Sequence, residues 1–152
     1  MKKYPLSNDQ IKKLLEEEPV GRLATIGEDG YPYVVPVHYV LAGDCIYMHG
    51  LAAGEKISNI KRNTQAGFEI DRMNGLSQAD TPCDTNTVYE SVVIRGKARL
   101  VEDEATRVKI LGSIVAKYTP QHSGKAFPDT VMRKTAVIEL TIESCTGKYY
   151  PA

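Results

Sequence analysis

The pair Asp29-Gly30 constrains the fold most strongly, because it stands between two strand-like stretches at residues 20–26 and 31–41. A tight hairpin turn needs positive φ angles, which Asp-Gly adopts readily. Gly43-Asp44 predicts a second turn, into a further strand at residues 45–48. This part of the chain is therefore expected to form an antiparallel meander of three strands.

Alternating side chains predict further strands in the second half of the chain. Apolar and polar residues alternate between residues 88 and 101, as in a half-buried strand, and Gly96 within this stretch indicates a bulge or a bend. A short strand is expected at residues 65–71, followed by a polar loop at residues 73–87. Residues 135–142 alternate again, and the side chains expected to face inward are Ala136, Ile138, Leu140 and Ile142.

Three helices are expected, at residues 7–18, 54–63 and 102–118. Ser7 and Gln10, three residues apart, form a capping box that starts the first helix. Residues 119–132 are expected to be mainly loop. The apolar stripe of the third helix is expected to consist of Ala105, Val108, Leu111, Val115 and Tyr118.

These elements predict a fold that is mainly β with flanking helices. About six strands, mostly antiparallel and connected in sequence, favour a sheet that curls into a small barrel over a parallel, doubly wound sheet. No internal repeat or linker divides the sequence, so a single domain is expected over residues 1–152.

Composition argues against several classes of partner. The chain has 19 basic and 19 acidic residues, and no basic run indicates binding to a nucleic acid or a membrane surface. No apolar stretch reaches the length of about 18 residues that a spanning helix needs, and the first residues lack the apolar segment of a secretory signal. A cytoplasmic location is therefore expected. Three cysteines without a C-x-x-C pair, and three histidines without nearby carboxylates, predict no metal site.

Pro36 interrupts an otherwise regular strand. Proline cannot donate a ladder hydrogen bond, so the stretch around it is an edge, a bulge or a gap in the sheet. A gap leaves backbone donors and acceptors free, and a flat heterocycle with alternating donors and acceptors could bind them. The alternative is a plain edge strand that binds nothing.

A His-Gly pair followed by Gly-Glu-Lys is the strongest indication of a binding site. His49 and Gly50 end a predicted strand, and Gly54 and Lys56 open a predicted helix. Helix N-termini attract anions, and a lysine there opposes the helix dipole unless an anion lies beside it. An imidazole can exchange a proton near neutral pH. The alternatives are a structural histidine, and a solvated lysine balanced by Glu55.

Other candidates are weaker. His38 lies in the middle of a predicted strand and could simply pack, and His122 follows a proline in a predicted loop. Arg95, Lys97 and Arg99 form a basic stripe on one strand face, which is either solvated or faces an anionic partner.

Taken in order, these segments resemble the FMN-binding split-barrel family, which includes pyridoxamine 5′-phosphate oxidase, and especially its nitroimidazole-resistance branch. The likeness spans roughly residues 7–148. The segments that carry it are GRLAT (21–25), GYPYVVPV (30–37), YMHG (47–50), GEK (54–56), YESVVIRGKA (89–98) and TGK (146–148).

The resemblance implies a homodimer that binds FMN in two clefts at its interface. His49 would act beside the flavin. One departure is Gly50, where many members have a hydroxyl residue, so backbone N–H groups would have to take its place. The basic substrate-phosphate site of pyridoxamine 5′-phosphate oxidases is not found. The residues that the resemblance assigns to the cofactor are Val34, Val35, Pro36, Val37, Met48, His49, Gly50, Lys56, Ser91 and Val92.

The function implied is an FMN-dependent oxidoreductase that reduces small electron-poor compounds such as nitroimidazoles and other nitroaromatics. His49 would donate a proton or orient the substrate, and the loop at residues 73–87, with Cys83, could cover the flavin. The alternatives are a flavin-binding or redox-sensing protein without turnover, and a haem or deazaflavin binder on the same barrel, with His49 or His38 as the haem ligand.

Overall fold

Seven strands form one antiparallel sheet, in the order β2-β1-β5-β6-β7-β4-β3. The structure is a computed structural model that describes residues 4–151, so residues 1–3 and 152 of the expected domain lie outside the described residues. The mainly β fold with flanking helices is confirmed, with one strand more than expected. The strands are β1 (Gly21–Ile26), β2 (Pro32–Val37), β3 (Tyr39–Ala42), β4 (Cys45–Leu51), β5 (Gln65–Ser77), β6 (Asn86–Leu100) and β7 (Thr135–Tyr150).

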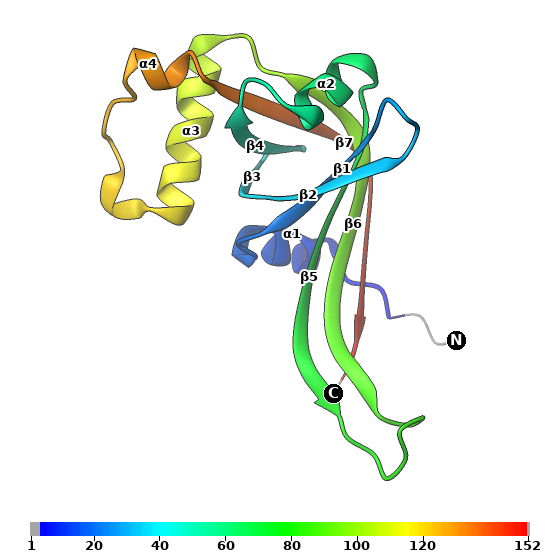
Figure 1. Cartoon of the computed structure of the whole chain (residues 1–152). Helices are drawn as coiled ribbons and strands as arrows, with labels where there is room; N and C mark the ends of the chain where they lie inside the picture. The colour runs from blue at the N-terminus through cyan, green and yellow to red at the C-terminus, as the bar shows by residue number, and fades with distance from the viewer. Residues whose placement is uncertain (1–3, 152) are drawn as a thin grey trace.

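The additional strand arises at His38, which interrupts the single strand expected at residues 31–41. β2 ends at Val37 and β3 begins at Tyr39, although the two strands lie at opposite ends of the sheet order. Because one residue joins both edges, the sheet has to curl back on itself (Figure 1). The two edge strands do not pair with each other in the described part of the chain, so the barrel is split, as expected.

β5, β6 and β7 extend beyond the barrel as a long arm (Figure 1). The prediction of a loop at residues 73–87 is therefore wrong over much of that range, since Met73 pairs with Tyr89 and Ser77 pairs with Asn86. The polar sequence did not prevent pairing, because the hydrogen bonds of a β-ladder join backbone groups and do not depend on the side chains. The register of the two strands shifts between Met73 and Gly75, and Gly75 has a φ of 130°. Only residues 78–85 connect the two strands.

Helices flank the sheet. In the predicted capping box, the Gln10 N–H donates to Ser7 Oγ (3.3 Å) and the Ser7 N–H donates to Gln10 Oε1 (2.8 Å). Among residues 4–151, no helix is long and apolar enough to cross a membrane. The helices are α1 (Asn8–Glu17), α2 (Glu55–Arg62), α3 (Glu104–Tyr118), the short 3-10 helix η1 (Pro120–His122) and α4 (Asp129–Met132).

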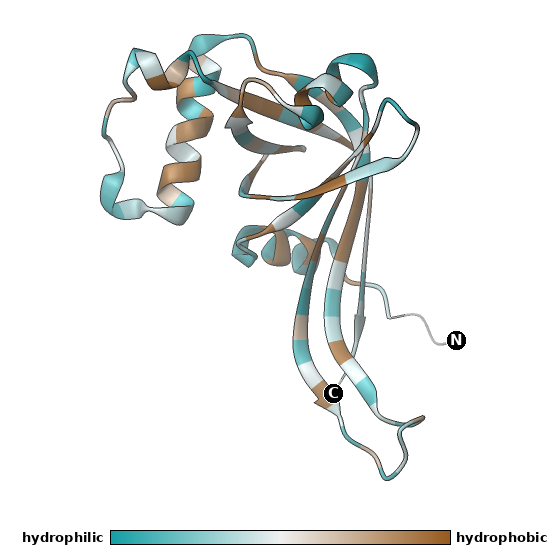
Figure 2. Cartoon of the chain, viewed as in Figure 1, coloured by the Kyte–Doolittle hydropathy of each residue, from teal (hydrophilic) through white to brown (hydrophobic). Residues whose placement is uncertain are grey.

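Two apolar clusters lie on opposite faces of β7. Ile138 packs into the larger cluster inside the barrel, and its neighbour Val137 packs into the smaller one with α3. Figure 2 shows hydrophobic residues along both β7 and α3. Residues 136–140 are all buried, so the alternation expected for residues 135–142 is only partly right. The cause is the helix layer, which covers the outer face of this strand.

α3 buries the expected stripe only in part, since Leu111 is buried as expected but two residues outside the stripe are buried as well. Ile110, Leu111 and Ile114 are buried, whereas Val108 is 43% exposed. α3 is apolar on more than one side, so periodicity did not identify the buried face. Contacts with the second cluster, which includes Val101 and Val137, decide it.

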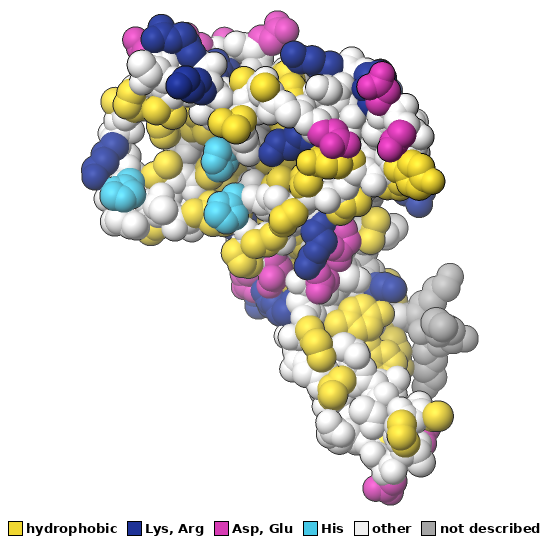
Figure 3. Space-filling model, viewed as in Figure 1, with side chains coloured by type: hydrophobic (Ala, Val, Ile, Leu, Met, Phe, Trp, Pro, Cys, Tyr) yellow, Lys and Arg dark blue, Asp and Glu magenta, His cyan; other side chains and the backbone are white. Residues whose placement is uncertain are grey.

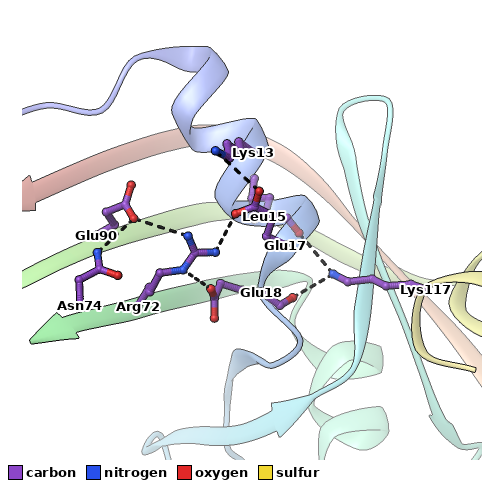
Figure 4. A network of polar contacts seen from close by, with 8 residues as sticks. All are labelled: Lys13, Leu15, Glu17, Glu18, Arg72, Asn74, Glu90 and Lys117. Atoms are coloured by element: carbon purple, nitrogen blue, oxygen red, sulfur yellow. Dashed lines mark hydrogen bonds and ion pairs between the residues drawn. The ribbon is translucent and has the colours of Figure 1, made fainter.

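A polar network joins α1 to the arm and to α3 (Figure 4). Arg72 on β5 donates to Glu18 (2.6 Å) and Glu17 (2.9 Å) at the end of α1. Lys117, from α3, donates to the Glu18 carbonyl oxygen (2.9 Å). These contacts satisfy carbonyl and carboxylate groups at the C-terminal end of α1, beside the corner where β2 and β3 meet.

Candidate functional site

A depression of about 380 Å³ opens where β2, β3, β4 and the start of α2 meet. We call it the histidine cleft. It brings together four of the predicted site residues, Pro36, Val37, His49 and Lys56, from three different elements. Its lining is Val20, Pro36, Val37, His38, His49 and Lys56.

Of the three alternatives that Pro36 left open, an edge, a bulge or a gap, the structure shows an edge strand. β2 pairs only with β1 in the sheet order, where Pro36 lies opposite Arg22. Val34 is 55% exposed, and Val35 packs against the barrel core. The free side of β2 therefore offers backbone groups beside the cleft, and a planar ligand could bind there through hydrogen bonds.

His49 lies within β4 rather than at its end, because the strand continues to Leu51 opposite Thr135 on β7. Its Nδ1 atom is buried and has no hydrogen-bond partner among the described residues. Burial lowers the pKa of His49, and the nearby charges of His38 and Lys56 lower it further. The imidazole is therefore held neutral and available for a polar ligand.

Lys56 lies in the first turn of α2, with its side chain over Gly50. A Cβ atom at Gly50 would lie 2.7 Å from Lys56 Nζ, so the glycine makes room for the ammonium group. Within residues 4–151 the ammonium makes no ion pair or hydrogen bond, and Glu55 does not balance it. Gly54 gives the helix no side-chain cap, so among the described residues the backbone N–H groups of Glu55 and Lys56 are also free. The backbone N–H of Ile57, in contrast, donates to the Gly54 carbonyl oxygen (3.1 Å).

The other predicted site residues lie outside the cleft. Met48 is fully buried in the barrel core, so only its backbone is available to a ligand. On β6, Val92 is fully buried and Ser91 pairs with Asp71 and Lys148 in the arm. The structure of one chain does not bring these β6 residues to His49.

His38, a weaker candidate in the sequence because it was expected in the middle of a strand, lines the cleft. Its ring stacks on Tyr118, with ring centroids 4.3 Å apart and an angle of 16° between the planes. The signal that could have found it is its place directly after Pro36 and Val37, where a strand that contains a proline could end. Figure 3 shows two histidine side chains close together beside a basic side chain, with the third histidine apart from them.

The basic stripe on β6 is largely paired. Arg99 donates to both carboxylate oxygens of Glu139 (2.7 and 3.0 Å), and Lys97 lies 3.6 Å from Glu143. Arg99 lines a larger depression of about 660 Å³, which contains none of the predicted site residues. The histidine cleft is therefore the better candidate for an anionic ligand.

The cleft combines features that fit a flavin phosphate and ring. An unpaired ammonium lies over a glycine beside free helix N–H groups, and an open strand edge lies next to it. In the described part of the chain, no group of three histidine, cysteine or carboxylate side chains could hold a metal ion.

The fold is an open antiparallel barrel with a basic cleft at its split edge. A family model described as pyridoxamine 5′-phosphate oxidase matches residues 7–149. The chain therefore belongs to this family, which is one of flavin-binding oxidoreductases.

A relative from Streptomyces rimosus subsp. rimosus is a 5a,11a-dehydrotetracycline/5a,11a-dehydrooxytetracycline reductase. It is 33% identical over 89 residues, which cover 56% of this chain and 57% of the relative. The match thus spans only a little over half the length of that reductase.

Two solved structures show the same fold. A candidate 5-nitroimidazole antibiotic resistance protein from Bacteroides thetaiotaomicron has a TM-score of 0.84 at 23% identity, over 97% of this chain and 87% of that one. A FAD and heme binding protein from Mycobacterium smegmatis has a TM-score of 0.87 at 17% identity, over 96% of this chain and 72% of that one.

Proposed function

We propose that this protein is an FMN-dependent oxidoreductase that reduces small electron-poor compounds such as nitroimidazoles and other nitroaromatics. The observation that carries the proposal is the position of Lys56 over Gly50, beside the His49 Nδ1 atom that has no partner. The flavin, when bound, supplies the electrons.

Each residue of the cleft has a distinct role in this proposal. Lys56 and the first N–H groups of α2 bind the flavin phosphate, and the backbone of Val34 to Val37 binds the ring. His49 orients the substrate through a hydrogen bond from its neutral ring, or passes on a proton that it first takes from solvent, because reduction of a nitro group consumes protons. Gly50 contributes by leaving space for the lysine side chain.

The proposal includes a homodimer with one flavin in each of two clefts at the interface. Ser91 and Val92 do not reach the cleft of their own chain. In a dimer they would contribute to the flavin site from the partner. The lining of the histidine cleft, which contains no residue of β6, supports this arrangement.

The class of cofactor is tested by the visible spectrum of the purified protein, before and after addition of flavin and desalting. We expect about one flavin per chain, and chromatography of the released chromophore should identify it as FMN. Release of FAD instead of FMN would change the identity of the cofactor and leave the rest of the proposal unchanged. A Soret band would favour the haem-binding alternative, and no retained chromophore would overturn the proposal.

Turnover is tested with His49→Ala, using His122→Ala as the control. His122 lies outside the cleft, with its Nδ1 atom 3.0 Å from Lys125 Nζ. We expect His49→Ala to retain flavin and to reduce nitroaromatics about 100-fold more slowly, the usual order for loss of a general acid. Equal rates in both variants at full flavin content would exclude His49 from the chemistry.

A second candidate function is the binding of a flavin without turnover. A protein with this function would have full flavin content but would reduce no nitroaromatic. It would also not reduce a tetracycline-like compound, the substrate class named for the Streptomyces relative. The same assays therefore separate the two functions.

A further inference from the structure

His38 occupies an unusual position in the fold. It is the single residue that joins the two edge strands, and its exposed side chain lines the cleft together with His49 and Lys56. In the described part of the chain, neither of its ring nitrogens has a hydrogen-bond partner. The ring therefore contributes two free polar atoms to the cleft.

Tyr118 at the end of α3 fixes the plane of that ring. The stack leaves the edge of the imidazole, which carries both nitrogens, uncovered. The Tyr118 hydroxyl accepts the N–H of Tyr39 at 2.9 Å, and it lies 2.9 Å from the carbonyl oxygens of Pro19 and Tyr39, to either of which it donates. The tyrosine side chain is thus tied to the backbone of Tyr39, at the start of β3, and to that of Pro19, just after α1.

The lining of the cleft indicates the charge of what it binds. It contains one ammonium and two imidazoles, and no acidic side chain. If Lys56 binds the flavin phosphate, as the proposed function requires, the two imidazoles remain for a second ligand. Both are suited to donate a hydrogen bond to an oxygen that carries negative charge.

Resting on the proposed function, we propose that His38 is a substrate-binding residue that, with His49, holds an oxyanion group of a planar substrate, and that Tyr118 is its positioning residue. The preferred substrates are then nitroaromatic or related compounds that also carry a carboxylate or an acidic enol. A neutral analogue of the same shape should bind less tightly.

Histidine NMR of the purified protein with its bound flavin tests this inference directly. The chain has three histidines, so three substitutions assign all three imidazoles. The probe is 4-nitrobenzoate, added to oxidised protein without an electron donor so that no turnover occurs. We expect the imidazole signals of His38 and His49 to shift and that of His122 to stay. A shift of His49 alone would overturn the role of His38.

Two substitutions at the corner separate binding from structure. His38→Phe keeps a ring on Tyr118 and removes both nitrogens, so the Kd for 4-nitrobenzoate should rise about 10- to 100-fold, the effect of losing one hydrogen bond to a charged group. Tyr118→Phe keeps the stack and removes the hydroxyl tether, so a smaller rise is expected. His38→Asn retains a donor and should partly restore binding.

Flavin content distinguishes this inference from the proposed function. If His38→Phe loses flavin, His38 is a cofactor residue and the inference is wrong. If it keeps flavin and binds 4-nitrobenzoate as tightly as the unaltered protein, the inference fails and the proposed function stands. If the unaltered protein retains no flavin, the proposed function fails, and the NMR titration of the flavin-free protein still decides whether His38 binds the probe. Equal affinity for 4-nitrobenzamide would contradict the preference for an oxyanion.

Discussion

At the scale of single residues, the pairing of a lysine with a glycine defines the site. Lys56 needs the space that Gly50 leaves, and a β-carbon there would lie 2.7 Å from the ammonium. A side-chain hydroxyl at position 50 would compete for that space. The departure of this chain from its family at Gly50 is therefore compatible with phosphate binding, which the lysine and the backbone can provide.

Replacement of Lys56 by alanine tests that site. Loss of a charge-assisted hydrogen bond should weaken FMN binding by about 1–3 kcal/mol. Lys61→Ala is the matched control, because Lys61 is an exposed lysine of the same helix that does not line the cleft. A titration followed by flavin fluorescence measures the affinity of both variants for FMN. Equal affinities would remove Lys56 from the phosphate site.

His49 should make the stability of the flavin-free protein depend on pH. Burial and its two basic neighbours lower the pKa of His49 in the folded state, whereas in the unfolded chain it stays near 6.5. Above about pH 7 the residue is neutral in both states. As pH falls below about 6.5 the unfolded chain binds the proton first, so the free energy of unfolding decreases.

Urea unfolding between pH 8 and pH 5 measures this effect. His49→Phe should lose part of the decrease at low pH, whereas the control His122→Phe should keep all of it. Identical pH profiles for the unaltered protein and His49→Phe would show that the cleft does not disfavour the charged imidazole.

At the scale of elements, the junction of β6 with β7 depends on a glycine. The bulge predicted from Gly96 is confirmed, because the register between the strands shifts between Arg95 and Gly96. A β-carbon at Gly96 would fall on the carbonyl oxygen of Thr141 on the neighbouring strand. The bulge therefore depends on the missing side chain as much as on the hydrogen bonds.

Two glycine-to-alanine substitutions should have opposite effects. Gly96→Ala should lower the free energy of unfolding by about 2 kcal/mol or more, because the strands must separate to fit the methyl group. Gly112→Ala should raise it by about 0.5–1 kcal/mol, because this exposed position in α3 has no atom within 4 Å of the new β-carbon. Denaturant unfolding measures the change in the free energy of unfolding for both variants. If Gly96→Ala left this free energy unchanged, the close approach of Gly96 to the Thr141 carbonyl oxygen would be contradicted.

At the scale of the whole molecule, β5 and β6 leave apolar side chains exposed. Met73, Leu76 and Val93 are 61%, 50% and 44% exposed on β5 and β6. In the proposed dimer such side chains would be covered by the partner, and the same strands would bring Ser91 to the other cleft. Assembly and flavin binding should then be linked.

Val93→Asp tests this linkage, with Val108→Asp as the control. The two valines are almost equally exposed, at 44% and 43%, but Val93 lies on β6 and Val108 lies on α3. Sedimentation should show the unaltered protein and the control at twice the mass of one chain. Val93→Asp should shift toward the monomer and lose flavin in parallel. Dissociation without loss of flavin would contradict a shared site.

The sequence by itself determined the local features of this protein. The capping box, the bulge at Gly96 and the approach of a histidine to a helix start were predicted, because each depends on backbone chemistry within a few residues. At Pro36 the sequence left an edge, a bulge or a gap open, and the edge is what the sheet contains. The family likeness and the split barrel were predicted in the same way, from the order of such segments.

Only the tertiary structure decided the features that depend on distant partners. The arm formed where a loop was expected, because β5 and β6 pair through backbone groups that do not depend on side-chain pattern. α3 buried Ile110 and Ile114 because the second cluster lies on that side. His38 became part of the cleft because curling of the sheet brings β4 and α3 to the point where two edge strands meet.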